Sequence, residues 1–174
     1  MQIKELIERA FTNAVGKGWH DKPATFGELI ALCHSEVSEA WAEDIAMGVY
    51  FNKGNPKPEG FAVELIDVCI RIFDMAGKFE IELFPFALCL SIPVRYDKDY
   101  FCCRIHQLLS DTLELYRVGV KPHGKNEITE KLSEIIAFID IGLTQYYETN
   151  VDEVIELKMN YNETRPYRHG GKKL

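Results

Sequence analysis

The sequence predicts an all-α protein folded as a helical bundle. Along most of the chain, apolar residues recur at the three- and four-residue spacing of amphipathic helices. No segment alternates apolar and polar residues as a half-buried strand does. With 174 residues, the chain is one domain, or one compact unit with an internal duplication, and it is long enough to bury a core.

The first two predicted helices cover residues 1–15 and 25–47. In the second, Thr25 is a suitable N-cap, and Glu28 stands three residues later as the other half of a capping box. The apolar stripe of this helix includes Trp41, which we therefore expect in the core. The segment that follows, FNKGNPKPEG, is rich in Pro and Gly and is predicted to be a loop.

The same periodicity predicts four further helices, at residues 60–78, 100–118, 127–148 and 151–163. Between the first two of these, IELFPFALCLSIPVRYDKD is apolar but is interrupted by Pro85 and Pro93, so we expect a connector with room for one short helix. His34 and His106 lie within apolar helical stretches, and we expect them to be hydrogen-bonded core histidines rather than catalysts.

Composition argues against several classes of protein. No apolar run reaches the ~20 residues that a membrane helix needs, so we expect no membrane partner. The five cysteines form no Cys-x-x-Cys pair, which is typical of reduced thiols in a cytoplasmic protein. The net charge is −7, and because residues 158–174 carry +4, residues 1–157 are at −11. A body this acidic argues against a nucleic-acid partner.

This asymmetry divides the chain into a bundle, residues 1–157, and a basic C-terminal arm, residues 158–174. The arm has two interpretations. It is a solvated tail that aids solubility, or it binds an anion.

Two acidic doublets stand on two neighbouring predicted helices. Glu36 and Glu39 lie in the helix at 25–47, and Glu64 and Asp67 lie in the helix at 60–78. Each doublet has a spacing of three residues, which places both carboxylates on one face of the helix. Two such helices packed by their apolar faces would bring four carboxylates together, at a high cost without counter-charge. A hard cation that prefers oxygen ligands, Mg²⁺ or Mn²⁺, would remove that cost.

A solvated acidic face is the alternative interpretation. Arg71, four residues after Asp67, can pair with it on a helix surface. A di-iron carboxylate centre does not fit the sequence. Such a centre needs Glu-x-x-His on two helices, and no histidine of the chain has a Glu three residues before it.

A faint internal repeat suggests that a helical hairpin is duplicated in degenerate form. The segment CHSEVSEAWAEDIAMG resembles RIHQLLSDTLELYRVG, and VELIDVCIRIFDMAG resembles EKLSEIIAFIDIGLT. In this alignment the four acids are replaced by Gln107, Ser110, Lys131 and Glu134. Two amphipathic hairpins can also resemble each other by chance, so both explanations stay open.

The acidic pattern, Glu36-x-x-Glu39, a spacer of 24 residues and then Glu64-x-x-Asp67, resembles the signature of the MazG-like all-α nucleoside triphosphate pyrophosphohydrolases. The tail KMNYNETRPYRHGGKK is similar to the basic C-terminal segment of some members of that family. The resemblance implies a helical bundle that assembles as a homo-oligomer, a dimer or a tetramer. It also implies a nucleotide substrate that is cleaved between the α and β phosphates.

The resemblance assigns roles to residues of this chain. It implies that the four acids are the Mg²⁺ ligands and that one of them helps to activate the attacking water. The substrate-binding residues that it implies are Lys158, Asn162, Arg165, Tyr167, Arg168 and Lys172. Arginine side chains can hold phosphate oxygens by bidentate bonds.

Three functions follow as hypotheses. The first is a Mg²⁺-dependent pyrophosphohydrolase that releases a nucleoside monophosphate and pyrophosphate. The second is a nucleotide-binding regulatory bundle without turnover. The third is a structural bundle whose acids are solvated. The complete set of four acids favours the first over the second, and the basic tail favours both over the third.

Overall fold

The computed structural model describes residues 2–85 and 97–168. In this part of the chain it confirms the all-α prediction. The helices are α1 (Ile3–Gly16), α2 (Phe26–Ala42), α3 (Phe61–Phe79), α4 (Lys98–Arg117), α5 (Glu127–Tyr146) and α6 (Val151–Thr164), with a 3-10 turn η1 (Ile45–Met47) and strands β1 (Tyr50–Phe51) and β2 (Pro58–Glu59). Most of the predicted connector between α3 and α4 lies outside the described residues.

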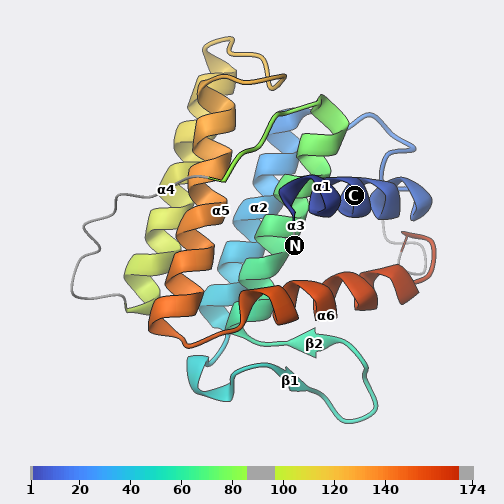
Figure 1. Cartoon of the computed structure of the whole chain (residues 1–174), viewed down its shortest axis with the longest axis vertical. Helices are drawn as coiled ribbons and strands as arrows, with labels where there is room; N and C mark the ends of the chain where they lie inside the picture. Colours follow the sequence, from blue (N-terminus) through green and yellow to red (C-terminus); the bar gives the residue numbers. More distant parts are fainter. Residues whose placement is uncertain (1, 86–96, 169–174) are drawn as a thin grey trace.

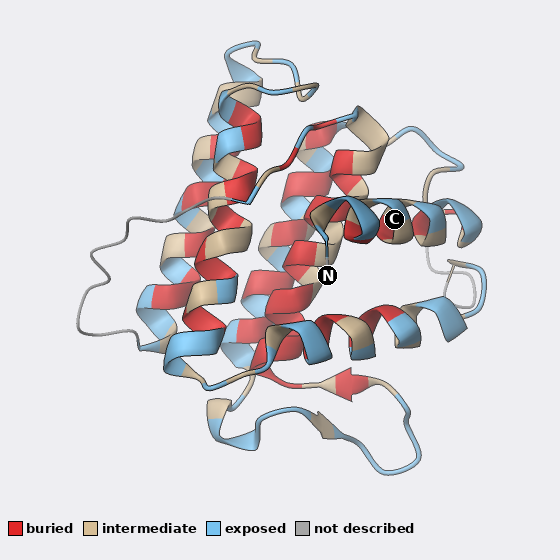
Figure 2. Cartoon of the chain, viewed as in Figure 1, coloured by how far each residue is buried: buried red, intermediate tan, exposed pale blue. Residues whose placement is uncertain are grey.

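Four helices, α2 to α5, stand side by side, and α1 and α6 lie across them (Figure 1). The helix α3 packs against α1, α2, α5 and α6. Twelve of its 19 residues are therefore buried, including Glu64 in its first turn. Figure 2 shows the buried positions on the facing sides of the helices, while the β1–β2 hairpin is largely exposed. An acidic residue on α3 thus lies in the environment of a core helix.

The predicted capping box begins α2, which ends earlier than predicted. The Thr25 side chain accepts a hydrogen bond from the Glu28 N–H at 3.2 Å, and Glu28 accepts one from the Thr25 N–H at 2.7 Å. The helix ends at Ala42 rather than near residue 47, because Glu43 is extended and the Asp44 side chain accepts a hydrogen bond from the Ala46 N–H, which starts the separate turn η1.

Trp41 is not a core residue, which corrects the sequence prediction. Its side chain is 53% exposed, and its indole N–H donates to Asp99 at 2.7 Å. The Lys98 Nζ lies 5.3 Å from the centre of its ring. On the last turn of α2 the indole meets the first turn of α4, where charged groups rather than apolar side chains surround it. His34 and His106 do bond to each other, with 2.8 Å between their Nδ1 atoms, and both are half-buried.

The predicted loop between α2 and α3 forms a small hairpin. Its strands pair antiparallel, with Tyr50 opposite Glu59 and Phe51 opposite Pro58. Gly60 closes the base at φ +123°, and a Cβ on it would collide with the carbonyl oxygen of Gly48. Only glycine fits both the torsion angle and this approach. The hairpin base is thereby fixed against the start of α3.

We expect Gly60→Ala to lower the free energy of unfolding by more than about 2 kcal/mol, on the order of the strain plus the backbone collision. Gly54→Ala is the matched control, because Gly54 also has a positive φ, +77°, but no atom lies within 4 Å of the position that a Cβ would take. That variant should lose only about 1 kcal/mol. Urea unfolding of both variants measures the difference. Equal losses in the free energy of unfolding would show that the collision with Gly48 does not contribute.

The α4–α5 hairpin repeats the arrangement of α2 and α3 beside it (Figure 1). At the positions that align with the acids, Arg104 reaches Gln107 at 3.4 Å and Glu134 at 3.3 Å, and Lys131 reaches Glu134 at 3.0 Å. The second hairpin thus carries its own basic partners. This arrangement is compatible with a degenerate duplication, which stays a prediction.

Among the described residues, no helix combines the length and the apolar character that a membrane span needs.

Candidate metal centre

Three of the four predicted acids come together between α2 and α3. One carboxylate oxygen from each of Glu36, Glu64 and Asp67 lies within 4.8 Å of the other two. Glu36 is 7% exposed, Glu64 is 2% exposed and Asp67 is half-buried. The two helices pack by their apolar faces, and the acidic edges of those faces meet as the spacing predicted.

Glu39 does not join this group. It is exposed, and its carboxylate accepts a hydrogen bond from the Ser35 hydroxyl at 3.4 Å. A step of three residues turns the helix by about 300°, so Glu39 lies about 60° round α2 from Glu36. Val37 and Ala40 are fully buried on the inner side, which leaves Glu39 at the solvent edge of the helix.

Basic side chains neutralise the charge of the group. Arg71 donates to Glu36 from Nε at 2.7 Å and also from Nη2, so it crosses to α2 instead of pairing with Asp67 as the alternative interpretation suggested. Lys158 enters from α6, is 1% exposed, and places its Nζ 2.7 Å from the Asp67 Oδ2. The Lys57 Nζ, 3.5 Å from the Glu64 Oε1, is a third cation, so three carboxylates face three basic side chains.

The helix α6 is held in place by α1. Arg9 of α1 donates to Glu156 at 2.7 Å and to Asn160 at 2.6 Å, and it also pairs with Glu163. These contacts fix the rotation of α6 about its axis. Lys158, on the opposite side of α6, consequently points into the acidic group.

Burial shifts the pKa values of the acids upward. It raises the pKa of Glu64 to about 7, although the nearby charge of Lys158 opposes the shift. It raises the pKa of Asp67 as well, again against Lys158. Among the described residues, no hydrogen-bond partner reaches the buried Oε2 of Glu64. The group therefore offers oxygen ligands and an unmet acceptor, which is the donor chemistry that a hard divalent cation takes.

The predicted substrate-binding residues divide into two sets. Arg165 is half-buried near the acids: burial lowers its pKa, while the charges of Asp67 and Glu36 raise it. Asn162 is half-buried on the last turn of α6, one turn beyond Lys158. With Lys158, these residues lie on the acidic side of the bundle.

Tyr167 and Arg168 instead tie the tail to the α1–α2 loop. The Tyr167 hydroxyl bonds to Asp21, and the Arg168 Nη2 lies 3.1 Å from the Asp21 Oδ2. The Arg168 backbone N–H donates to the Lys17 carbonyl at 3.0 Å. These contacts give both residues an anchoring role in the structure. Lys172 lies outside the described residues.

A second acidic group was not predicted as a site. Glu43, Glu59 and Glu64 also place one oxygen each within 4.8 Å of one another, so Glu64 belongs to both groups. Glu43 could be found from the sequence, because it continues the stripe of Glu36 and Glu39. Glu59 could not, since the loop around it carries no helical periodicity.

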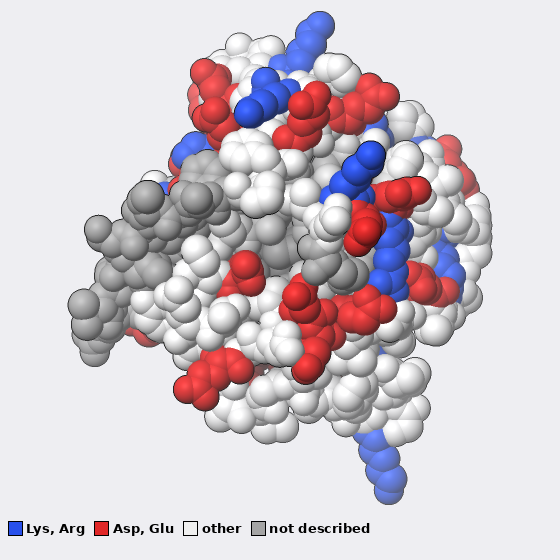
Figure 3. All heavy atoms as spheres, in the orientation of Figure 1, with Lys and Arg blue, Asp and Glu red and all other residues white. Residues whose placement is uncertain are grey.

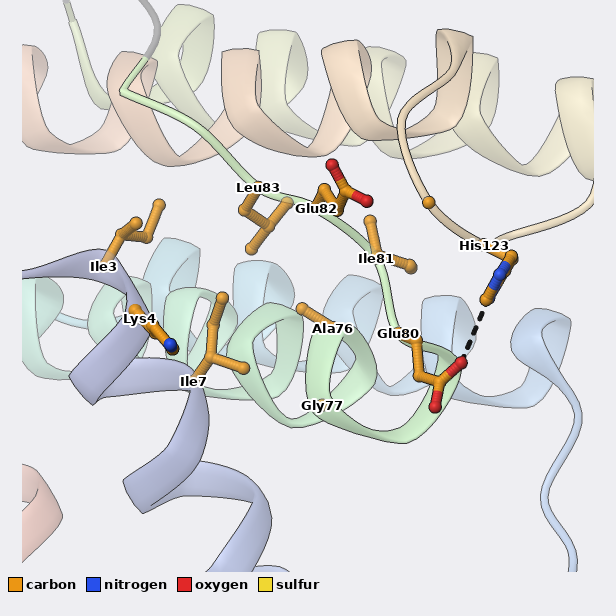
Figure 4. Close-up of a pocket in the computed structure, with 11 residues that line it drawn as sticks. Ile3, Lys4, Ile7, Ala76, Gly77, Glu80, Ile81, Glu82, Leu83 and His123 are labelled. Carbon is orange, nitrogen blue, oxygen red and sulfur yellow. Dashed lines mark ion pairs between the residues drawn. The ribbon is translucent and has the colours of Figure 1, made fainter.

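The acids do not line the groove shown in Figure 4. That groove, of about 570 Å³, lies between α1 and the segment after α3, and Ile3, Ile7 and Leu83 face into it. The ion pair of Glu80 with His123 stands at its rim. The groove is at the C-terminal end of α3, whereas Glu64 and Asp67 are on its first two turns and Glu36 is on α2. On the face drawn in Figure 3, Lys and Arg side chains are interspersed with Asp and Glu, and the described residues form no continuous basic patch there.

In comparisons with known proteins, no family model, no curated protein and no solved structure matches this chain. The chemistry of the site therefore rests on its own residues and on the resemblance of its motifs.

We expect Glu64→Gln to stabilise the metal-free protein at high pH. The folded pKa of Glu64 is about 7, above its ordinary 4.5, so its stabilising contribution is present below pH 4.5 and is lost as pH rises through 7. Gln does not titrate. Relative to wild type, the variant should thus gain on the order of 2–3 kcal/mol between the two limits.

Urea unfolding in EDTA across this pH range measures the gain. Glu130→Gln, an exposed position on α5, is the control and should follow the wild-type curve. With Mg²⁺ in excess the order should reverse, because the wild type then gains binding energy that the variant lacks. Parallel curves for Glu64→Gln and wild type in EDTA would contradict the burial argument.

Proposed function

We propose that this protein is a Mg²⁺-dependent nucleotide pyrophosphohydrolase that converts a nucleoside triphosphate to the monophosphate and pyrophosphate. The observation that carries the proposal is the group of Glu36, Glu64 and Asp67, which is largely buried between α2 and α3. The resemblance to the MazG-like signature supplies the substrate class and the bond that is cleaved. It also supplies the proposal of a homo-oligomer, while the pattern of reduced cysteines supplies that of a cytoplasmic location.

The residues present fit a hard cation. All donors are carboxylate oxygens, and the Glu64 Oε2 is a buried acceptor that no described residue satisfies. When bound, Mg²⁺ supplies neutralisation of phosphate charge and Lewis acidity. Glu36, Glu64 and Asp67 would hold it, and Glu39 is proposed as a fourth acid that reaches it from the solvent edge of α2.

The remaining residues bind and orient the substrate. A triphosphate is repelled by the acids and needs cationic partners beside them. Arg165 is placed to contact phosphate oxygens, and Lys158 is placed to do so when it leaves Asp67. One of the acids would help to activate the attacking water, as the resemblance implies.

A nucleotide-binding module without turnover is the second candidate. One observation favours it: Arg71 and Lys158 already pair with Glu36 and Asp67, so two side chains compete with an ion for the same oxygens. Such a protein would retain nucleotide binding and release no product. The two candidates differ in a single measurement, the release of pyrophosphate in the presence of Mg²⁺.

We expect Asp67→Asn and Glu36→Gln each to lower kcat/KM by at least about 100-fold, because each removes a carboxylate ligand of the proposed ion. Glu39→Gln should lower kcat less and raise the Mg²⁺ concentration needed for half-maximal activity, since Glu39 is the most exposed of the four acids. A panel of nucleotides with Mg²⁺, resolved by chromatography, measures the monophosphate and pyrophosphate formed. Glu130→Gln should keep wild-type kinetics.

Hydrolysis in ¹⁸O-labelled water identifies the attacked phosphorus. Label in the monophosphate or in pyrophosphate agrees with cleavage between the α and β phosphates. Label in orthophosphate would refute it. Tight nucleotide binding with no product from any nucleotide in the panel would favour the binding module.

Arg165 and Arg168 should differ sharply on replacement by Ala. Arg165→Ala removes a charge-assisted phosphate contact worth about 1.5–3 kcal/mol, roughly ten- to hundredfold in kcat/KM. Arg168→Ala releases the tail from Asp21, so it should mainly increase proteolysis of the C-terminus and change kcat/KM less. Limited proteolysis and steady-state kinetics on both variants test the contrast, and a larger kinetic loss for Arg168→Ala would return that residue to the substrate site.

A further inference from the structure

Three carboxylates from three different elements meet at the base of the β1–β2 hairpin. Glu43 is the residue directly after α2, Glu59 is in β2, and Glu64 is in the first turn of α3. Their oxygens lie within 4.8 Å of one another. Figure 1 shows this end of α2 and α3 directly above the hairpin. The group is distinct from the one formed with Glu36 and Asp67, apart from the shared Glu64.

The backbone fixes this meeting point. The hairpin register sets Glu59 opposite Tyr50, and the Tyr50 hydroxyl donates to Glu43 at 2.9 Å. Gly60 packs on Gly48, which brings the strand β2 against the start of α3. The carboxylates are therefore held by a closed segment of backbone and do not depend on flexible surface side chains for their position.

The charges of this group are only partly balanced. Lys57 lies 2.7 Å from the Glu59 Oε2 and 3.5 Å from the Glu64 Oε1. Burial lowers the pKa of Lys57, but the hydrogen bond to Glu59 and the charge of Glu64 outweigh burial. The net pKa is raised, so Lys57 stays a cation. Glu64, 2% exposed, leaves its Oε2 without a hydrogen-bond partner among the described residues. The two acidic groups together hold five carboxylates and three cations, Lys57, Arg71 and Lys158, so two negative charges remain when all five acids are ionised.

We propose that Glu43, Glu59 and Glu64 form a second divalent-cation site, which shares Glu64 with the first. An all-oxygen donor set selects Mg²⁺, Mn²⁺ or Ca²⁺ over the softer transition metals. The widest oxygen–oxygen separation in an octahedral shell is about 4.2 Å for Mg²⁺ and about 4.8 Å for Ca²⁺, so oxygens that lie within 4.8 Å of one another are near enough to contact one ion after they move together. A carboxylate with two oxygens can bridge two such ions, as in other two-metal centres. This is a proposal about binding, and it does not require turnover.

Lys57 competes with the ion for the same oxygens. Its Nζ already contacts two of the three carboxylates, so an ion that binds there has to displace it. Removal of Lys57 should strengthen the site, while removal of Glu59 should abolish it. Variants with opposite expected effects separate a binding site from a merely structural ion pair.

Titration of the metal-free, full-length protein with Mn²⁺, followed by the EPR signal of the free ion, counts the ions bound. We expect two per wild-type chain, one for Glu59→Gln and one for Asp67→Asn. In Glu59→Gln the loss of a ligand should weaken the second site at least about tenfold, so that it stays empty at the Mn²⁺ concentrations that fill it in the wild type, whereas in Lys57→Met the second ion should bind more tightly. Glu130→Gln should bind two, and circular dichroism establishes that each variant is folded.

A single ion in the wild type, or two ions with unchanged affinity in Glu59→Gln, would overturn the second site. If Glu59→Gln does not fold, Lys57→Met decides alone, and unchanged or weaker binding there counts against the proposal. The result is separable from the proposed activity. Two bound ions without nucleotide turnover would refute the proposed hydrolase activity and support the second cation site. Turnover with one bound ion would support the activity and refute the second site.

Discussion

The burial of Glu64 is the constraint around which the acidic end of this bundle is built. Its carboxylate is 2% exposed on α3, the helix that α1, α2, α5 and α6 all contact. An uncompensated ion in such a place costs several kcal/mol, and the pKa of about 7 records that cost. Lys158 from α6 and Lys57 from the hairpin both lower it by their charge. Two peripheral elements, the hairpin and α6, therefore each bring a lysine charge near one carboxylate in a core helix.

The parts of this arrangement that follow from local pattern were predictable from the sequence. Six helices follow from apolar periodicity, and the start of α2 follows from the capping box of Thr25 and Glu28. The meeting of Glu36 with Glu64 and Asp67 follows from helical geometry, because three-residue spacing puts each doublet at the edge of an apolar face. These features depend on a few neighbouring residues, and packing did not change them.

The parts that depend on long-range contacts were not predictable. Which side of α2 turns inward depends on how α2 packs on its neighbours, and the packed side holds Val37 and Ala40 and leaves Glu39 exposed. Trp41 fits the apolar stripe of α2 but reaches past the core to Asp99. The partner of Arg168 is Asp21, about 150 residues earlier in the chain, and no local pattern indicates it. Glu59 joins the acids only because the turn at Gly60 folds the hairpin back onto α3.

The two helical hairpins, α2–α3 and α4–α5, differ in how completely basic side chains neutralise their acids. In α4 and α5, the one acid at the aligned positions, Glu134, has two basic partners, Arg104 and Lys131, so the charge is fully met by side chains. In α2 and α3, Glu36 and Asp67 have one basic partner each, and Lys57 alone is shared by Glu59 and Glu64. A structural role would be served by complete pairing, as in the second hairpin. The first hairpin instead keeps a buried oxygen unsatisfied and an excess of negative charge, a cost in stability that the proposed cation would relieve. The contrast between the halves therefore points to ligand binding, rather than to fold stability, as the reason for the acids on α2 and α3.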